Sequence, residues 1–277
     1  MDNSVFLEDL DAFAYREALS SGEAIVLIPV GSLEQHGPHL PLGTDTLLSS
    51  RFAEGVARRL GALVAQPIAY GYKSQQKSGG GNHLSGTTSL DGATLIGVAR
   101  NLVKSFLNQG VRHVVFINGH FENYQFLYEG IDLALEDLGI KPGAEQSVLL
   151  LSYWDFVSQD TLAEVYPDGF PGWDIEHGGV LETSLMLHLE PARVAMGRLV
   201  DGPAAVLPRF DRLPVVPERT PATGCLSSAA GSSAAKGELL YRQVVEDLAV
   251  DLARELNREG ILPATPPLSA DYQYQRQ

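Results

Sequence analysis

The sequence predicts a three-layer α/β/α fold, in which helices cover both faces of a mostly parallel central sheet. Short runs rich in β-branched residues alternate with longer stretches of helical period, which is the pattern of such a sheet. The first run, residues 24–30, is apolar at every position, as expected of a strand that is buried on both faces.

Four strands are expected, each a short run dominated by Val, Ile and Leu. The first ends at Gly31 and the third at Gly119. They cover residues 24–30, 63–68, 113–118 and 147–152.

Five helices are expected where apolar residues recur with helical period. Thr44 is the candidate N-cap of the first helix, and Gly61 lies where that helix should stop. Gly110 and Gly139 follow the next two helices in the same way. The helices cover residues 45–60, 91–108, 123–138, 179–188 and 235–259.

Three segments lack the period of a helix or a strand. Residues 70–83 are polar and rich in glycine and form a long loop, and residues 153–174, which hold both tryptophans, form a long ordered loop. Five prolines make residues 201–224 an extended arm. We expect one domain over residues 1–261, followed by a flexible C-terminal tail over residues 262–277.

Charge and composition exclude several functions. The 277-residue chain has 34 acidic and 20 basic residues, a formal charge of −14, so nucleic acid and anionic lipid surfaces are unfavourable partners. No apolar run approaches the roughly 20 residues of a membrane-spanning helix, and the acidic start lacks the basic residues of an export signal. The cytoplasm is therefore the expected location. A single cysteine, Cys225, forms neither an intrachain disulfide nor a thiolate site, so nitrogen and oxygen atoms must hold any metal.

Metal-ligating side chains follow the first and third strands. Glu34 and His36 are two residues apart, as are His120 and Glu122, so each pair points one way in an extended segment. Asp45 opens the following helix and has two oxygens with which to bridge two cations. Because ligands bind beyond the carboxyl ends of parallel strands, we expect these side chains to converge. Imidazoles and carboxylates suit Zn²⁺, Mn²⁺ or a mixed pair, and do not choose between them.

A further cluster lies at a junction between a loop and a helix. His177 and Glu176 are placed there to carry protons, for which the ordinary pKa of histidine is suited. The alternative is that His177 only starts the helix. Trp154 and Trp173 belong either to the core or to the wall of a pocket for a flat ligand.

These motifs resemble those of the creatininase family of metal-dependent amidohydrolases. The resemblance extends from about Val5 to the last helix. It also includes residues 70–83 and 151–156, which are closest to members that hydrolyse creatinine. Its motifs are Glu34-Gln35-His36-Gly37, Thr44-Asp45, Asn118-Gly119-His120 and Glu176-His177-Gly178-Gly179.

The resemblance implies a homohexamer with a binuclear metal centre. It places one divalent ion on Glu34, Asp45 and His120, and the other on His36, Asp45 and Glu122. The implied reaction is the reversible hydrolysis of a cyclic amide, creatinine, to creatine by a water that two metal ions activate. Catalysis is expected to involve His177, Glu176 and Glu122, and substrate binding Ser78, Phe121, Trp154, Trp173 and Asp174.

Phe121 leaves the substrate open, because a tyrosine is expected at this position in a creatininase. The alternatives are hydrolysis of another cyclic, linear or N-formyl amide and, outside the enzymes, a metal-binding structural protein. Metal content without amidase turnover would favour the last of these.

Overall fold

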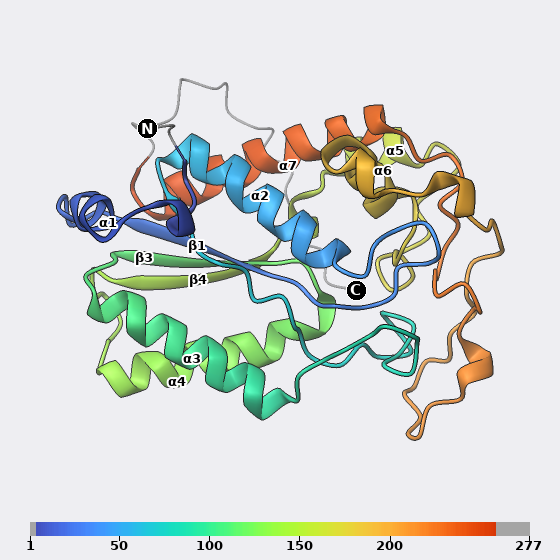
Figure 1. Ribbon diagram of the computed structural model, residues 1–277, viewed down its shortest axis with the longest axis horizontal. Helices are drawn as coiled ribbons and strands as arrows, with labels where there is room; N and C mark the ends of the chain where they lie inside the picture. The colour runs from blue at the N-terminus through green and yellow to red at the C-terminus, as the bar shows by residue number, and fades with distance from the viewer. Residues whose placement is uncertain (1–3, 259–277) are drawn as a thin grey trace.

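Four parallel strands form the central sheet of the computed structural model, which describes residues 4–258 (Figure 1). Their order across the sheet is β2-β1-β3-β4. The register pairs Val30 with Asn118 and Asn118 with Ser152, so the carboxyl ends of β1, β3 and β4 are level with one another. The strands are β1 (Ile25–Val30), β2 (Leu63–Val64), β3 (His113–Asn118) and β4 (Ser147–Ser152).

Helices cover both faces of this sheet. In Figure 1, α3 and α4 lie against one face, and α2 and α7 lie against the other. The helices are α1 (Ala12–Leu19), α2 (Thr44–Leu60), α3 (Gly92–Asn108), α4 (Tyr124–Leu138), α5 (Gln159–Val165), α6 (Val180–Leu189) and α7 (Ala234–Glu255).

The two cores use alternate residues of the buried strands. Ile25 and Leu27 pack with α2 and α7, whereas Val26 and Ile28 pack with α3 and α4. Successive side chains of a strand point to opposite faces, so an all-apolar strand serves both cores. This arrangement confirms the predicted three-layer fold.

Several predicted boundaries are wrong. The second strand ends at Val64, because Pro67 has no N–H to donate, and only a single bridge joins Val30 to Ile68 farther along. Thr44 is the first helical residue rather than the N-cap, which is Gly43. The last helix ends at Glu255; position 259 and the predicted tail lie outside the described residues.

Short helices were not expected. Asp11 caps α1, because its side chain accepts from two backbone N–H groups. The helix has no buried residue, so its pattern is weak. Residues 153–174 are only partly loop, because they contain a 3₁₀ turn over Tyr153–Phe156 and α5, which Ser158 caps. The arm at 201–224 contains no α-helix or strand, as expected, but it bends several times and includes a 3₁₀ turn at Pro217–Arg219 and a second turn at residues 222–223.

No helix within residues 4–258 is long and apolar enough to cross a membrane.

Candidate metal centre and active site

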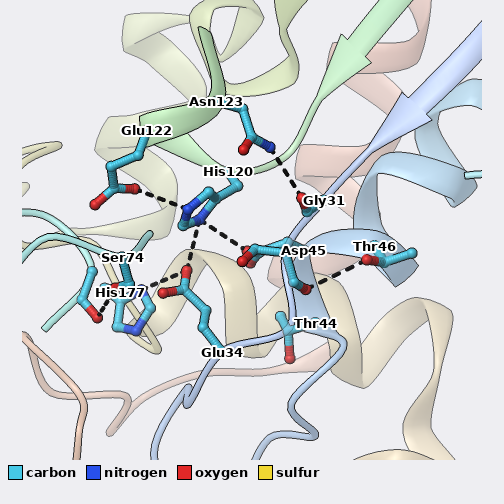
Figure 2. A network of polar contacts seen from close by, with 12 residues as sticks. Gly31, Glu34, Thr44, Asp45, Thr46, Ser74, His120, Glu122, Asn123 and His177 are labelled. Carbon is cyan, nitrogen blue, oxygen red and sulfur yellow. Dashed lines mark hydrogen bonds and ion pairs between the residues drawn. The ribbon is translucent and has the colours of Figure 1, made fainter. Parts of the chain in front are cut away.

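The carboxyl ends of β1 and β3 bring the predicted metal-ligating side chains together, and Figure 2 shows Glu34, Asp45 and His120 among them. Glu34 and His36 come from the loop after β1, Asp45 from the first turn of α2, and His120 from the segment after β3. All four side chains are buried. The prediction that these side chains converge is confirmed.

Two residues fix the relative position of these segments. The Asn123 amide donates to the Gly31 carbonyl at 3.0 Å and accepts from the Tyr72 backbone N–H at 2.8 Å, which joins the end of β1 to the 70–83 loop (Figure 2 shows the first bond). At Gly119 the backbones approach so closely that a Cβ would lie 2.7 Å from the Asp45 carbonyl oxygen. Only glycine fits there without displacing the start of α2.

The first ligand group comprises Glu34, Asp45 and His120. His120 Nδ1 lies 2.8 Å from Glu34 Oε1 and 3.2 Å from Asp45 Oδ2. These ligand atoms lie within 4.8 Å of one another, as a shared metal ion requires.

The second ligand group comprises His36, Asp45 and Glu182. His36 Nε2 lies 2.8 Å from Asp45 Oδ1 and 3.6 Å from Glu182 Oε1. Asp45 thus turns one oxygen to each histidine, as a bridging carboxylate would. Glu182, on α6, was not predicted to take part, and its carboxylate is buried.

Backbone carbonyls set the tautomer of both histidines. His36 Nδ1 is 3.2 Å from the Glu34 carbonyl oxygen, and His120 Nε2 is 3.0 Å from the Tyr72 carbonyl oxygen, so each of these nitrogens donates its hydrogen there. The other nitrogen of each neutral ring then carries a lone pair and faces carboxylate oxygens. With both rings neutral, two acceptors face each other, and either a shared cation or a proton on the ring stabilises the contact.

Three buried nitrogen and oxygen atoms of the cluster lack hydrogen-bond partners, as expected of metal ligands. His36 Nε2, Glu34 Oε2 and Asp45 Oδ2 have no hydrogen-bond partner. Burial lowers the pKa of His36, but the Asp45 and Glu182 carboxylates raise it well above the ordinary value, and Glu34 and Glu122 act on His120 likewise. The cluster holds excess negative charge, and its nitrogen and oxygen donors fit divalent cations.

Glu122 lies on the other side of His120. Its Oε2 is 3.3 Å from His120 Nε2, and its Oε1 accepts from Ser78 Oγ at 2.6 Å and from the Gln75 backbone N–H at 2.7 Å. The assignment of Glu122 to the ion at His36 stays a prediction, because Glu182 is the carboxylate that the structure places beside His36.

His177 completes the cluster with a free nitrogen. Its Nε2 donates to the Gln35 carbonyl at 2.7 Å, and its Nδ1 lies 3.9 Å from Glu34 Oε1. The ring stacks at a tilt on His36, with centroids 4.2 Å apart. A neutral ring held in this way presents a lone pair to the site, which suits proton transfer.

Glu176 hydrogen-bonds to Tyr166 and to the start of α6. Its Oε1 accepts from the Tyr166 hydroxyl at 2.8 Å and from the Leu181 backbone N–H at 2.6 Å. Burial and the nearby Glu182 charge raise the pKa of Glu176 to about 7. Its contacts fix the turn that carries His177 into the start of α6.

A cavity of about 600 Å³ opens onto the cluster. The predicted substrate residues all line it, and Trp173 is 41% exposed at this wall, so the alternative that both tryptophans are core residues is wrong for Trp173. Sequence reasoning missed Lys77 and Asp211, which the loop and the distant arm supply. The predicted residues in the lining are Ser78, Phe121, Trp154, Trp173 and Asp174.

Comparison with known proteins identifies the family. Residues 8–252 match the family model described as "Creatininase: Creatinine amidohydrolase". Creatinine amidohydrolase from Pseudomonas putida is 50% identical over 256 residues, 92% of this chain and 98% of the relative. A more distant relative, the mycofactocin precursor peptide peptidase of Mycolicibacterium smegmatis, is 31% identical over 88% of this chain and 91% of its own.

Solved structures agree with this match. "Creatininase Mn" has a TM-score of 0.89 and 49% identity, and covers 91% of this chain and 99% of that one. "E122Q mutant creatininase, Zn-Zn type" has a TM-score of 0.89 and 48% identity, over 91% and 98% of the two chains. The same variant "complexed with creatine" has a TM-score of 0.88 and 48% identity, over 91% and 99%.

Proposed function

Because the chain belongs to the creatininase family, we propose that it hydrolyses the cyclic amide creatinine to creatine, reversibly, with two divalent metal ions. The observation that carries this proposal is the Asp45 carboxylate, whose two oxygens face the bare nitrogens of two histidines at 2.8 and 3.2 Å. A binuclear centre of this kind is suited to amide hydrolysis.

Four side chains would hold the two ions, and a fifth, a carboxylate, would complete the second site. Glu34 and His120 would bind the first and His36 the second, with Asp45 bridging; Glu182 by geometry and Glu122 by resemblance are the candidates to complete the second site. When bound, Zn²⁺ or Mn²⁺ supplies Lewis-acid polarisation of a carbonyl and activates a water at neutral pH.

The His177 ring would move the proton. In the reaction the water oxygen bonds to the ring carbonyl carbon, the C–N bond of the ring breaks, and the departing nitrogen takes up a proton. His177 Nδ1 faces the site, while its Nε2 is held by the Gln35 carbonyl, so Nδ1 accepts the proton of the water and delivers it to that nitrogen. Glu176 acts as a positioning residue, because it orders the turn that carries His177.

The cavity suits a small, flat substrate. Aromatic rings of Trp154 and Trp173 line it, and a planar ring can stack on them. Asp174 offers a carboxylate to the amidine part of creatinine, and Ser78 is already directed at Glu122. Phe121, 65% exposed at the mouth, contributes an apolar surface and no hydroxyl.

A turnover assay tests this function. Metal-reconstituted protein should convert creatinine to creatine, and should lose that activity on chelation and regain it with Mn²⁺ or Zn²⁺. The same preparation should be assayed with a linear peptide amide, since one relative is a peptidase. Peptide cleavage without creatinine hydrolysis would show that the protein is an amide hydrolase whose substrate is a peptide rather than creatinine. Bound metal with neither activity would favour a structural protein.

The predicted homohexamer and cytoplasmic location are part of this proposal. The family match supports the hexamer, and the cytoplasmic location stays a prediction.

A further inference from the structure

A second cavity, of about 420 Å³, adjoins the first. One wall is the 70–83 loop and the other is the arm between Pro208 and Arg219, which Figure 1 shows in teal and orange. Gln75, Lys77 and Asp211 line both cavities. Its volume is sufficient for a small metabolite.

Cations are concentrated in this second cavity. Lys73, Lys77, Arg212 and Arg219 line it, against the single carboxylate of Asp211. The whole chain has a formal charge of −14, so this local excess of positive charge is the reverse of the average surface. Within residues 4–258, no ion pair of 4.0 Å or less joins any of these four cations to a carboxylate.

Arg219 has a buried donor without an acceptor. Its Nη1 is inaccessible to solvent and has no hydrogen-bond partner. A guanidinium N–H that is buried away from water is destabilising unless it has a hydrogen-bond acceptor. The planar arrangement of the arginine N–H groups matches the oxygens of a carboxylate, phosphate or sulfate.

The walls of the cavity are fixed to each other. Gln76 Nε2 donates to the Val216 carbonyl at 2.7 Å, and the Thr220 hydroxyl donates to the Gly80 carbonyl at 2.6 Å. Thr220 is buried. The two walls are therefore joined near Arg219, and the space between them is preformed there.

We propose that this second cavity binds an oxyanion, the phosphate or carboxylate group of a small molecule, with Arg219 and Arg212 as its main contacts. The site lies beside the active site, because Gln75, which lines the cavity, donates its backbone N–H to Glu122 Oε1. The inference does not depend on creatinine being the substrate.

Calorimetric titration of the metal-loaded protein tests the site. Sodium sulfate and sodium acetate are titrated separately at constant ionic strength, sulfate as the probe for phosphate groups and acetate as the probe for carboxylates. We expect saturable binding of one anion per chain, and the tighter of the two probes identifies the chemistry of the ligand.

Variants locate the binding. Arg219→Ala and Arg212→Ala should each lower the affinity for the more tightly bound anion at least tenfold. Arg209→Ala, on the same arm but outside the cavity lining, should leave the affinity within twofold. Arg212 is exposed, so its variant should fold even if Arg219→Ala does not. The proposal is overturned if neither probe binds saturably. It is also overturned if Arg212→Ala and Arg219→Ala leave the binding unchanged, since the anion would then be bound elsewhere, for example by the metal ions.

Discussion

Among single side chains, the direction in which each histidine turns its lone pair decides the chemistry of the site. The Glu34 and Tyr72 carbonyls take the hydrogens of His36 and His120, and the opposite nitrogens face carboxylates. The same principle governs His177, whose hydrogen is held by the Gln35 carbonyl. Three separate main-chain oxygens thus prepare the cluster for cations and for proton transfer.

Glu182→Gln tests whether Glu182 completes the second metal site. Its Oε1 is 3.6 Å from His36 Nε2, and a neutral amide is a weaker ligand than a carboxylate. Elemental analysis should therefore show a fall from two ions per chain to one. Glu164→Gln, at an exposed position on α5, is the matched control and should keep both ions. Two retained ions in the Glu182 variant would leave Glu122 as the ligand.

His177→Ala tests the proton carrier. Removing a general acid–base group lowers kcat by about 10²–10⁴-fold, and the metal content should stay the same. Steady-state kinetics with creatinine and metal analysis of one preparation give both values. If the variant lost metal, His177 would be a ligand, and if kcat were unchanged it would have no role in the reaction.

Among the elements, the close approach of β3 to α2 determines the geometry of the centre. The segment after β3 passes the first turn of α2 at Gly119, and Asn123 ties it to the end of β1. The distance between Asp45 and His120 therefore depends on backbone packing as well as on side chains.

Gly119→Ala should destabilise the protein by about 1–3 kcal/mol, because the new methyl would lie 2.7 Å from the Asp45 carbonyl oxygen. The measurement is the free energy of unfolding from urea titration. Gly97→Ala on α3 meets nothing within 4 Å and is the control; it should stabilise the protein by about 0.5–1 kcal/mol. Equal effects of the two substitutions would show that the contact at Gly119 is relaxed easily.

The same elements show what the sequence could reveal. The bounds of β3 and β4 were predicted correctly because each is an apolar run between two polar residues. Glu34, His36 and His120 were found because they follow strands, and Asp45 because it opens the next helix. The extent of β2 was wrong because its length depends on N–H donors opposite β1, which Pro67 interrupts.

The site residues that the sequence did not predict depend on partners far away along the chain. Glu182 was missed because the His36 imidazole that it faces lies far away in the sequence, and no local pattern marks the pair. Asp211 reaches the cavity from an arm whose path no periodicity describes. Tertiary packing decides such positions, and local preference does not.

For the whole molecule, we predict a hexamer, on the basis of the resemblance to creatininases. Size-exclusion chromatography with light scattering should give six times the chain mass of 29.9 kDa, about 180 kDa. The mass should be measured before and after chelation, to show whether assembly needs the metal. A mass of one or two chains in the metal-loaded protein would contradict the prediction.

The bridging role of Asp45 is the central claim, because its carboxylate belongs both to the group with Glu34 and His120 and to the group with His36 and Glu182. Elemental analysis of metal-reconstituted wild-type protein and of Asp45→Ala, with circular dichroism to confirm that the variant is folded, tests it most directly. We predict two ions per chain in the wild type and at most one in the variant. Two ions in a folded Asp45→Ala protein would contradict the bridge and the mechanism that depends on it.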